Sequence, residues 1–118
     1  MIKDIVSFVC LICAQDGIIS ETEINSLKEQ LKKYQKKLNI KNPSEKEFER
    51  LVEDFFNSEK DIDDYYKLLH SSIETELLLH IALVSATSDG LDIRENIAFD
   101  RALKISNKNL DDIEKWEE

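Results

Sequence analysis

CAQDGIISETEI, residues 13–24, is the stretch of sequence that decides the fold. It closes an apolar segment with an Asp16-Gly17 turn and then offers a helix start in Ser20 and Glu23. A glycine just beyond a helix end can adopt the left-handed conformation that satisfies the last carbonyls. A serine followed three residues later by a glutamate has the spacing of a capping box. The stretch therefore predicts a helix, an Asp-Gly turn and a second helix.

A second version of this stretch, ATSDGLDIRE, occurs at residues 86–95. Its turn is Asp89-Gly90, and Asp92 and Glu95 repeat the capping-box spacing. The two turns contain the only glycines of the chain. Both stretches therefore predict the same helix-turn-helix unit.

The composition favours a single all-α domain over residues 1–118. Hydrophobic residues make up 42% of the chain, which has two glycines and one proline. A domain of this length buries roughly two thirds of the surface that its unfolded chain exposes. An all-β fold needs many tight turns, and three glycine and proline residues are too few to form them. We therefore predict a compact bundle of about seven helices.

Two of these helices are apolar over most of their circumference, which is typical of helices buried on several sides. One spans residues 2–15, and the other follows Ser71. We expect the two helices to pack together at the centre of the fold. Their least polar faces contain Val9, Ile12, Leu78 and Leu79.

The remaining helices follow from apolar spacing and from start signals such as Ser44 with Glu47. They are expected at residues 21–38, 44–56, 58–70, 93–105 and from residue 110 onward. Residues 1–38 and 73–105 then form two helix-turn-helix halves, each an apolar helix followed by an amphipathic one. The chain is therefore predicted to contain an internal pseudo-repeat.

The charge distribution excludes one class of partner and favours others. The net charge is −9, and phosphate contacts require a basic surface, so we expect no nucleic-acid binding. Residues 28–41 differ, with six lysines against one glutamate, a local charge of +5. They have two interpretations: a solvated face with cations near a helix C-terminus, or a docking patch for an acidic protein partner or an anionic membrane surface. The patch would consist of Lys28, Lys32, Lys33, Lys36 and Lys37.

The apolar runs at residues 5–14 and 77–86 are about half of the ~20 residues that span a bilayer. The N-terminal segment does not fit a signal peptide, because Asp4 interrupts its charge pattern and no small-x-small cleavage site follows. We therefore expect a core helix there, no transmembrane helix and a cytoplasmic protein.

The two turns and the C-terminal segment resemble the TerB-like family, the small helical domain of tellurite-resistance TerB proteins. A relative of this domain forms the N-terminal region of the membrane-bound DjlA co-chaperones. The resemblance is carried by CAQDG at residues 13–17 with Ser20 and Glu23, by ATSDG at 86–90 with Glu95, and by ALKISNKNLDDI at 102–113. It implies an all-helical domain whose acidic residues bind a divalent metal, found in bacterial stress-response and conflict systems.

The second turn departs from the first in its spacing. One residue fewer separates Gly90 from its cap Asp92 than separates Gly17 from Ser20. Strict alignment with Glu23 requires an acid at position 96, which is Asn96. The preceding residue, Glu95, is therefore taken as the acid of the second turn.

The acids of the turns suggest a shared cation site. A true EF-hand is not expected, because Ile12 and Ala14 would occupy ligand positions in the first half of its loop. A pooled site for Ca²⁺ or Mg²⁺ would instead take ligands from both turns. Its candidate ligands are Asp16, Glu23, Asp89 and Glu95. The alternative needs no ion: each aspartate bonds turn amides and each glutamate closes its capping box.

No catalytic constellation is recognisable. Cys10 and Cys13 lie on one side of an apolar helix without a second pair for zinc, so we expect buried reduced thiols. His80 stands among leucines and is expected to be a core histidine, and neither it nor His70 is close in sequence to a nucleophile. We therefore expect a non-enzymatic accessory or regulatory module. The alternative is a small acidic immunity protein that inhibits a toxin, suggested by the chain length and the −9 charge.

Overall fold

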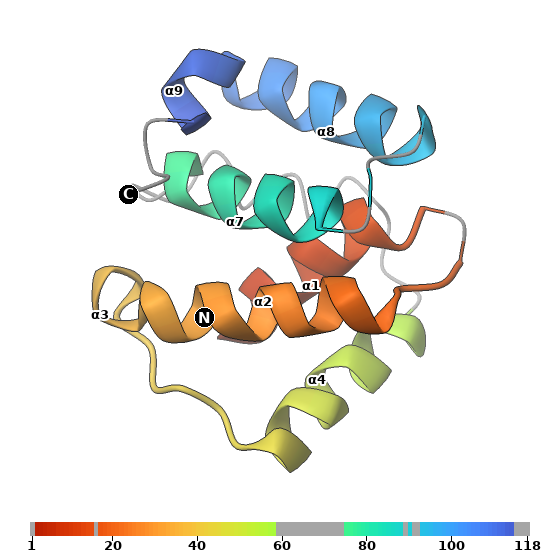
Figure 1. Ribbon diagram of the computed structural model, residues 1–118, viewed down its shortest axis with the longest axis vertical. Coiled ribbons are helices and arrows are strands. Elements are labelled where there is room, and N and C mark those ends of the chain that lie inside the picture. Colours follow the sequence, from red (N-terminus) through yellow and green to blue (C-terminus); the bar gives the residue numbers. More distant parts are fainter. Residues whose placement is uncertain (1, 16, 59–74, 89, 91–92, 115–118) are drawn as a thin grey trace.

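Seven helices and no strand occur in the part of the chain that the structure describes (Figure 1). The structure is a computed structural model and describes residues 2–15, 17–58, 75–88, 90 and 93–114. None of the described helices is long and apolar enough to cross a membrane. The helices are α1 (Ile2–Cys13), α2 (Glu21–Lys33), α3 (Gln35–Leu38), α4 (Glu45–Phe56), α7 (Thr75–Thr87), α8 (Ile93–Ser106) and α9 (Leu110–Glu114).

The two least polar helices, α1 and α7, pack against each other, as the sequence predicts. Val9 and Ile12 of α1 and Leu79 of α7 are fully buried, and Leu78 is nearly so. α7 also packs against α2, α8 and α9, and α1 also packs against α2, α4 and α8. In Figure 1, α8, α7, α2 and α4 follow one another from top to bottom, with α1 behind them. The two apolar helices therefore form the centre to which the other helices attach.

The helix expected at residues 21–38 is two helices in the structure. Tyr34 separates α2 from α3, because its φ of −106° and ψ of 14° depart from α-helical values. Tyr34 is buried, and its ring meets that of His80 edge to face, with 5.8 Å between the centroids. The apolar spacing continues through the break from Leu31 to Leu38, so periodicity alone could not reveal it.

The other described helices lie close to their expected positions. α4 begins after Ser44, whose hydroxyl accepts a hydrogen bond of 3.2 Å from the N–H of Glu47. α8 and α9 begin at Ile93 and Leu110, as expected. The helix expected at residues 58–70 lies outside the described residues.

Candidate metal centre

The glycines that follow α1 and α7 have similar backbone geometry. Gly17 and Gly90 have φ of 90° and 96°, a region that residues with side chains rarely adopt. The N–H of Gly17 donates to the carbonyl of Ala14 at 3.0 Å, and that of Gly90 donates to the carbonyl of Thr87 at 3.2 Å. Both connections lie at the same end of the molecule, on the right in Figure 1. The glycines therefore adopt the positive φ that the sequence predicts.

Two of the four predicted ligands are described, and the fold brings them together. Asp16 and Asp89 lie outside the described residues. Glu23 and Glu95, which are 72 residues apart in sequence (95 minus 23), each offer a carboxylate oxygen within 4.8 Å of the other. Asn96, at the position strictly aligned with Glu23, is exposed instead. The packing is therefore consistent with Glu95, and not residue 96, as the acid of the second half.

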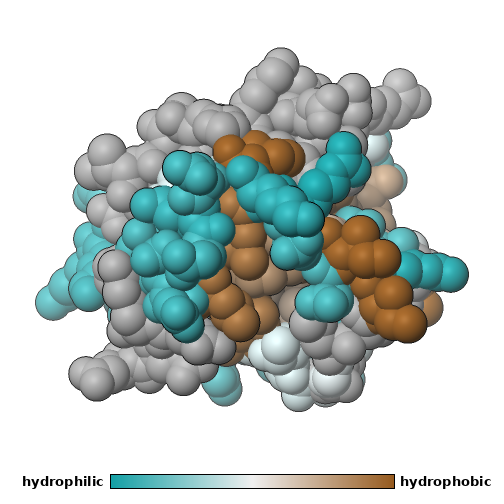
Figure 2. Space-filling model, turned by 90° about the horizontal axis from the view of Figure 1, so that it is seen from above, coloured by the Kyte–Doolittle hydropathy of each residue, from teal (hydrophilic) through white to brown (hydrophobic). Residues whose placement is uncertain are grey.

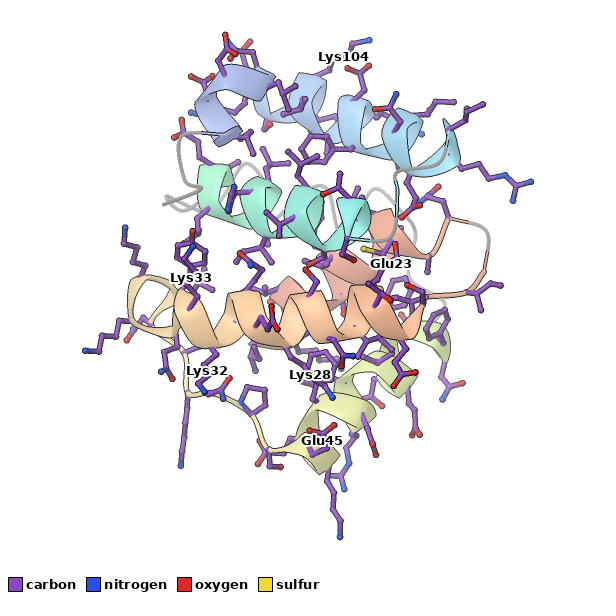
Figure 3. All side chains as sticks on the ribbon, in the orientation of Figure 1. Glu23, Lys28, Lys32, Lys33, Glu45 and Lys104 are labelled. Atoms are coloured by element: carbon purple, nitrogen blue, oxygen red, sulfur yellow. The ribbon has the colours of Figure 1, made fainter. Side chains whose placement is uncertain are left out.

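Glu23 lies in the first turn of α2, on the side that faces α7 (Figure 3), and only 4% of its surface is exposed. The predicted capping box is present: Glu23 Oε1 accepts a hydrogen bond of 3.0 Å from the N–H of Ser20, and the N–H of Glu23 donates to Ser20 Oγ at 3.1 Å. Glu23 Oε2 is buried and has no hydrogen-bond partner among the described residues. One oxygen of this carboxylate thus closes the cap, which leaves the other available to a ligand.

Glu95 and Cys13 complete a buried triad with Glu23. Glu95 is the third residue of α8 and is 5% exposed, and Cys13 is the last residue of α1 and is 2% exposed. One ligand atom from each of the three residues lies within 4.8 Å of the others. The triad therefore joins the end of α1 to the starts of α2 and of the distant helix α8.

Cys13 is the member of the triad that sequence reasoning missed. Both cysteines are buried and neither forms a disulfide, as expected. Only Cys13 lies at the helix end beside the carboxylates, three residues before Asp16, and this position was the one available signal. The Cys10 thiol differs, because burial and then the charge of Glu23 raise its pKa from 9.0 to about 12. Cys10 therefore remains a protonated thiol at neutral pH.

The residues present fit a divalent cation. Two ligand atoms of one tetrahedral Zn²⁺ ion lie about 3.5 Å apart, and two ligand atoms of one Ca²⁺ ion lie at most about 5.2 Å apart, from the usual bond lengths. The three ligand atoms of the triad lie within 4.8 Å of one another, which is inside the Ca²⁺ limit, and a Zn²⁺ ion would draw them closer together. Glu23 Oε2 supplies a buried acceptor without a hydrogen bond from the described residues. The carboxylates of Glu23 and Glu95 lie much closer than the separation of about 10 Å that would exclude a shared ion.

The five lysines of the predicted docking patch do not share one face. Lys28 forms an ion pair with Glu45 of α4, and its ammonium lies 5.3 Å from the centre of the Phe48 ring. Lys28 and Lys32 lie on the α4 side of α2, whereas Lys33 lies on the other side (Figure 3). The remaining two are exposed residues of α3: Lys36 and Lys37.

A surface pocket of about 210 Å³ lies between α2 and the start of α4. Its lining carries both signs of charge, with Lys28 and Lys32 beside Glu29 and Glu45. The pocket therefore selects neither an acidic nor a basic ligand by its charge.

His80 has a structural role, as expected. It is buried, and its Nδ1 lies 3.1 Å from the carbonyl oxygen of Ile113 in α9. With the Tyr34 ring against it, the imidazole joins α7 to α9 and to the α2–α3 break.

A scan of protein-family models finds no match for this chain, and searches of curated proteins and of solved structures find no significant match either. The resemblance to the TerB-like family therefore rests on the sequence motifs alone.

Proposed function

We propose that the chain is a TerB-like domain that acts as a non-enzymatic accessory or regulatory module of a bacterial stress-response or conflict system. Its two helix-turn-helix halves form a pseudo-repeat and bind one divalent cation between their turns, for which the carboxylate oxygens suggest Ca²⁺ or Mg²⁺. The observation that supports this most is the buried Glu23 Oε2, which has no hydrogen-bond partner among the described residues and lies beside Glu95.

The electrostatics of the two carboxylates support a cation. A carboxylate withdrawn from water needs hydrogen bonds or an opposite charge to offset its lost hydration. Glu23 and Glu95 each lie in the first turn of a helix, where the helix dipole favours a negative charge. Two such carboxylates held together repel one another. A divalent cation between them removes this repulsion.

The arrangement also suggests how an ion could regulate the domain. Glu23 belongs to the first half of the chain and Glu95 to the second. An ion that binds both carboxylates stabilises the packing of α1 and α2 against α7 and α8. Binding therefore raises the stability of the whole domain.

Calorimetry and thermal melting with Ca²⁺ and with Mg²⁺ test the proposal. Binding to the folded state should produce heat and raise the melting temperature. Glu23→Gln and Glu95→Gln should abolish both effects while preserving the helical spectrum, since glutamine can also close a capping box. Asp16→Asn and Asp89→Asn test the two predicted ligands outside the described residues.

Glu47→Gln is the matched control, because Glu47 has the same position after the cap Ser44 but is exposed. It should leave the ion effect unchanged. If wild-type protein shows neither heat nor a thermal shift at millimolar concentrations of both ions and of Zn²⁺, the cation proposal is wrong.

Exposed isoleucines favour a second candidate function, the binding of a protein partner, such as the toxin of an immunity protein. Ile93 and Ile97 are 79% and 62% exposed and lie one turn apart on α8. In Figure 2, which views the molecule from the side of α8 and α9, apolar side chains interrupt the hydrophilic surface. Adjacent exposed apolar residues are a common feature of protein interaction sites.

Pull-down from the native host at low and at high ionic strength tests this candidate. The −9 charge should contribute an electrostatic attraction to the partner. Salt screens this attraction, so less partner should be captured at high ionic strength. The double variant Ile93→Ser and Ile97→Ser should lose the partner and remain folded. If the wild-type chain and this variant capture the same proteins, the isoleucines do not bind a partner.

A further inference from the structure

The thiol of Cys13 distinguishes the buried triad from an all-oxygen site. Ca²⁺ and Mg²⁺ are hard cations that take oxygen ligands almost exclusively. A thiolate is a soft ligand that selects metals such as Zn²⁺. Cys13 contributes its sulfur within 4.8 Å of both carboxylates, at a position that is 2% exposed. One of the three described donor groups therefore does not suit the hard cations.

A mixed set of one sulfur and two carboxylate oxygens suits Zn²⁺. Zinc binds cysteine sulfur at about 2.3 Å and carboxylate oxygen at about 2.0–2.2 Å, with four ligands in all. The described residues provide three donors, one from each of α1, α2 and α8. Glu23 Oε2, without a hydrogen bond from the described residues, is already buried beside them.

The second cysteine provides an internal comparison. Cys10 lies one helical turn before Cys13 on α1 and is also buried. It is not part of the triad. A zinc site built from the Cys-x-x-Cys pair would require both sulfurs at the metal. The geometry of the triad instead separates the two cysteines into one ligand and one core residue.

We infer that Cys13 is a metal ligand and that the site formed by Cys13, Glu23 and Glu95 binds Zn²⁺ in preference to Ca²⁺ or Mg²⁺. This inference rests on the proposed cation site and specifies its metal. The Cys13 thiol gives up its proton when the ion binds, since the sulfur coordinates as a thiolate. The carboxylates of Glu23 and Glu95 then complete the described ligand set.

Cobalt substitution tests the role of Cys13 directly. The full chain is stripped of metal with a chelator, kept reduced and titrated with Co²⁺. A cobalt–thiolate bond should produce a charge-transfer band in the near ultraviolet, and added Zn²⁺ should remove it. Cys13→Ala should lose the band, whereas Cys10→Ala should keep it. The thermal shift produced by Zn²⁺ should follow the same pattern.

The fold should tolerate the key substitution, because Ala86 occupies the corresponding place before Gly90 and is fully buried. If Cys13→Ala nevertheless fails to fold, Cys13→Ser gives the same spectroscopic test with a side chain of nearly unchanged size. Loss of the band in that variant supports the inference equally.

Two results would overturn the inference. The first is a wild-type chain without a cobalt–thiolate band, and the second is a band that persists in the Cys13 variants. If Ca²⁺ or Mg²⁺ still raises the melting temperature through Glu23, the proposed cation site stands and only the role of Cys13 is wrong. If none of the ions binds, both proposals fail.

Discussion

The glycines of the α1–α2 and α7–α8 connections have nearly the same φ, but the residues before them differ. Gly17 and Gly90 differ by only 6° in φ (96° minus 90°). Four residues before each glycine, the first connection has Cys13 and the second has Ala86, and both are buried. The backbone therefore repeats because both turns contain Asp-Gly, whereas the thiol comes from one connection only.

The carboxylates of Glu23 and Glu95 differ in their spacing from the glycine but agree in their position in the structure. Glu23 lies six residues after Gly17, and Glu95 lies five residues after Gly90, so the spacing differs. Both nevertheless lie in the first turn of a helix and are buried together. Position within the helix, more than distance from the turn, determines which acid reaches the site.

The largest expected effect concerns the core on which both connections depend. Leu79→Ala removes a fully buried side chain of α7 and should lower the free energy of unfolding by about 2–5 kcal/mol. Ile93→Ala, at an exposed position of α8, should change it by less than about 0.5 kcal/mol. Urea denaturation measures both values. Similar losses in the two variants would show that α7 is not central.

The next effect tests whether the two connections share one ion. At an ion concentration of 100 times Kd, binding to the folded state alone adds about 2.7 kcal/mol to the free energy of unfolding. Glu23→Gln and Glu95→Gln should each lose this gain. Thermal melting with and without ion measures it, and loss in only one of the two variants would contradict a shared site.

The same two substitutions should have the opposite sign without an ion. Replacing either glutamate by glutamine removes one of two like charges that lie within 4.8 Å. The metal-free variants should therefore be at least as stable as metal-free wild type in chemical denaturation. Marked destabilisation of both variants would indicate that the carboxylates stabilise the fold without an ion.

Much of this comparison could be predicted from the sequence. The positive-φ glycines, the Ser20–Glu23 capping box and the central packing of α1 and α7 follow from local spacing and apolar pattern. The glycines and the capping box depend on residues within one or two helical turns of each other, and the central packing follows from the apolar circumference of each helix taken by itself. Local rules therefore describe them well.

The rest depends on packing between distant segments. The sequence indicates that Glu23 caps α2, but not that its second oxygen is buried beside Glu95. Cys13 appears in the sequence as an ordinary apolar position of α1, and only the approach of α2 and α8 makes it part of a site. The break at Tyr34 likewise leaves the apolar period unchanged, so the spacing does not reveal it.

A smaller effect tests the equality of the two turns. Gly17→Ala and Gly90→Ala should each cost about 1–2 kcal/mol, because an L-residue is strained at positive φ. An added Cβ would meet no heavy atom within 4 Å at either position, so the cost is expected from the backbone alone. Asparagine, which tolerates this region better, should cost less at both positions. Urea denaturation measures the loss in the free energy of unfolding. Clearly unequal losses at the two positions would show that the two turns are not equivalent.

The smallest expected effect at neutral pH concerns Cys10, because it appears only as the pH rises. Because its pKa is raised from 9.0 to about 12 by burial and then by Glu23, the unfolded chain loses the thiol proton first as pH rises. The contribution of the protonated thiol to stability is therefore complete below about pH 9 and is lost progressively between pH 9 and 12.

Chemical denaturation of metal-free wild type and Cys10→Ala at pH 7 to 10 measures this contribution. Tyrosines and lysines titrate in both proteins, so their effects cancel in the difference. That difference should be constant up to about pH 8 and then fall by roughly 1.4 kcal/mol per pH unit once the unfolded thiol is ionised. A difference that stays constant to pH 10 would mean that the folded thiol ionises as easily as the unfolded one. The burial of Cys10 in the core would then not hinder loss of its proton, contrary to the 0% exposure of this residue.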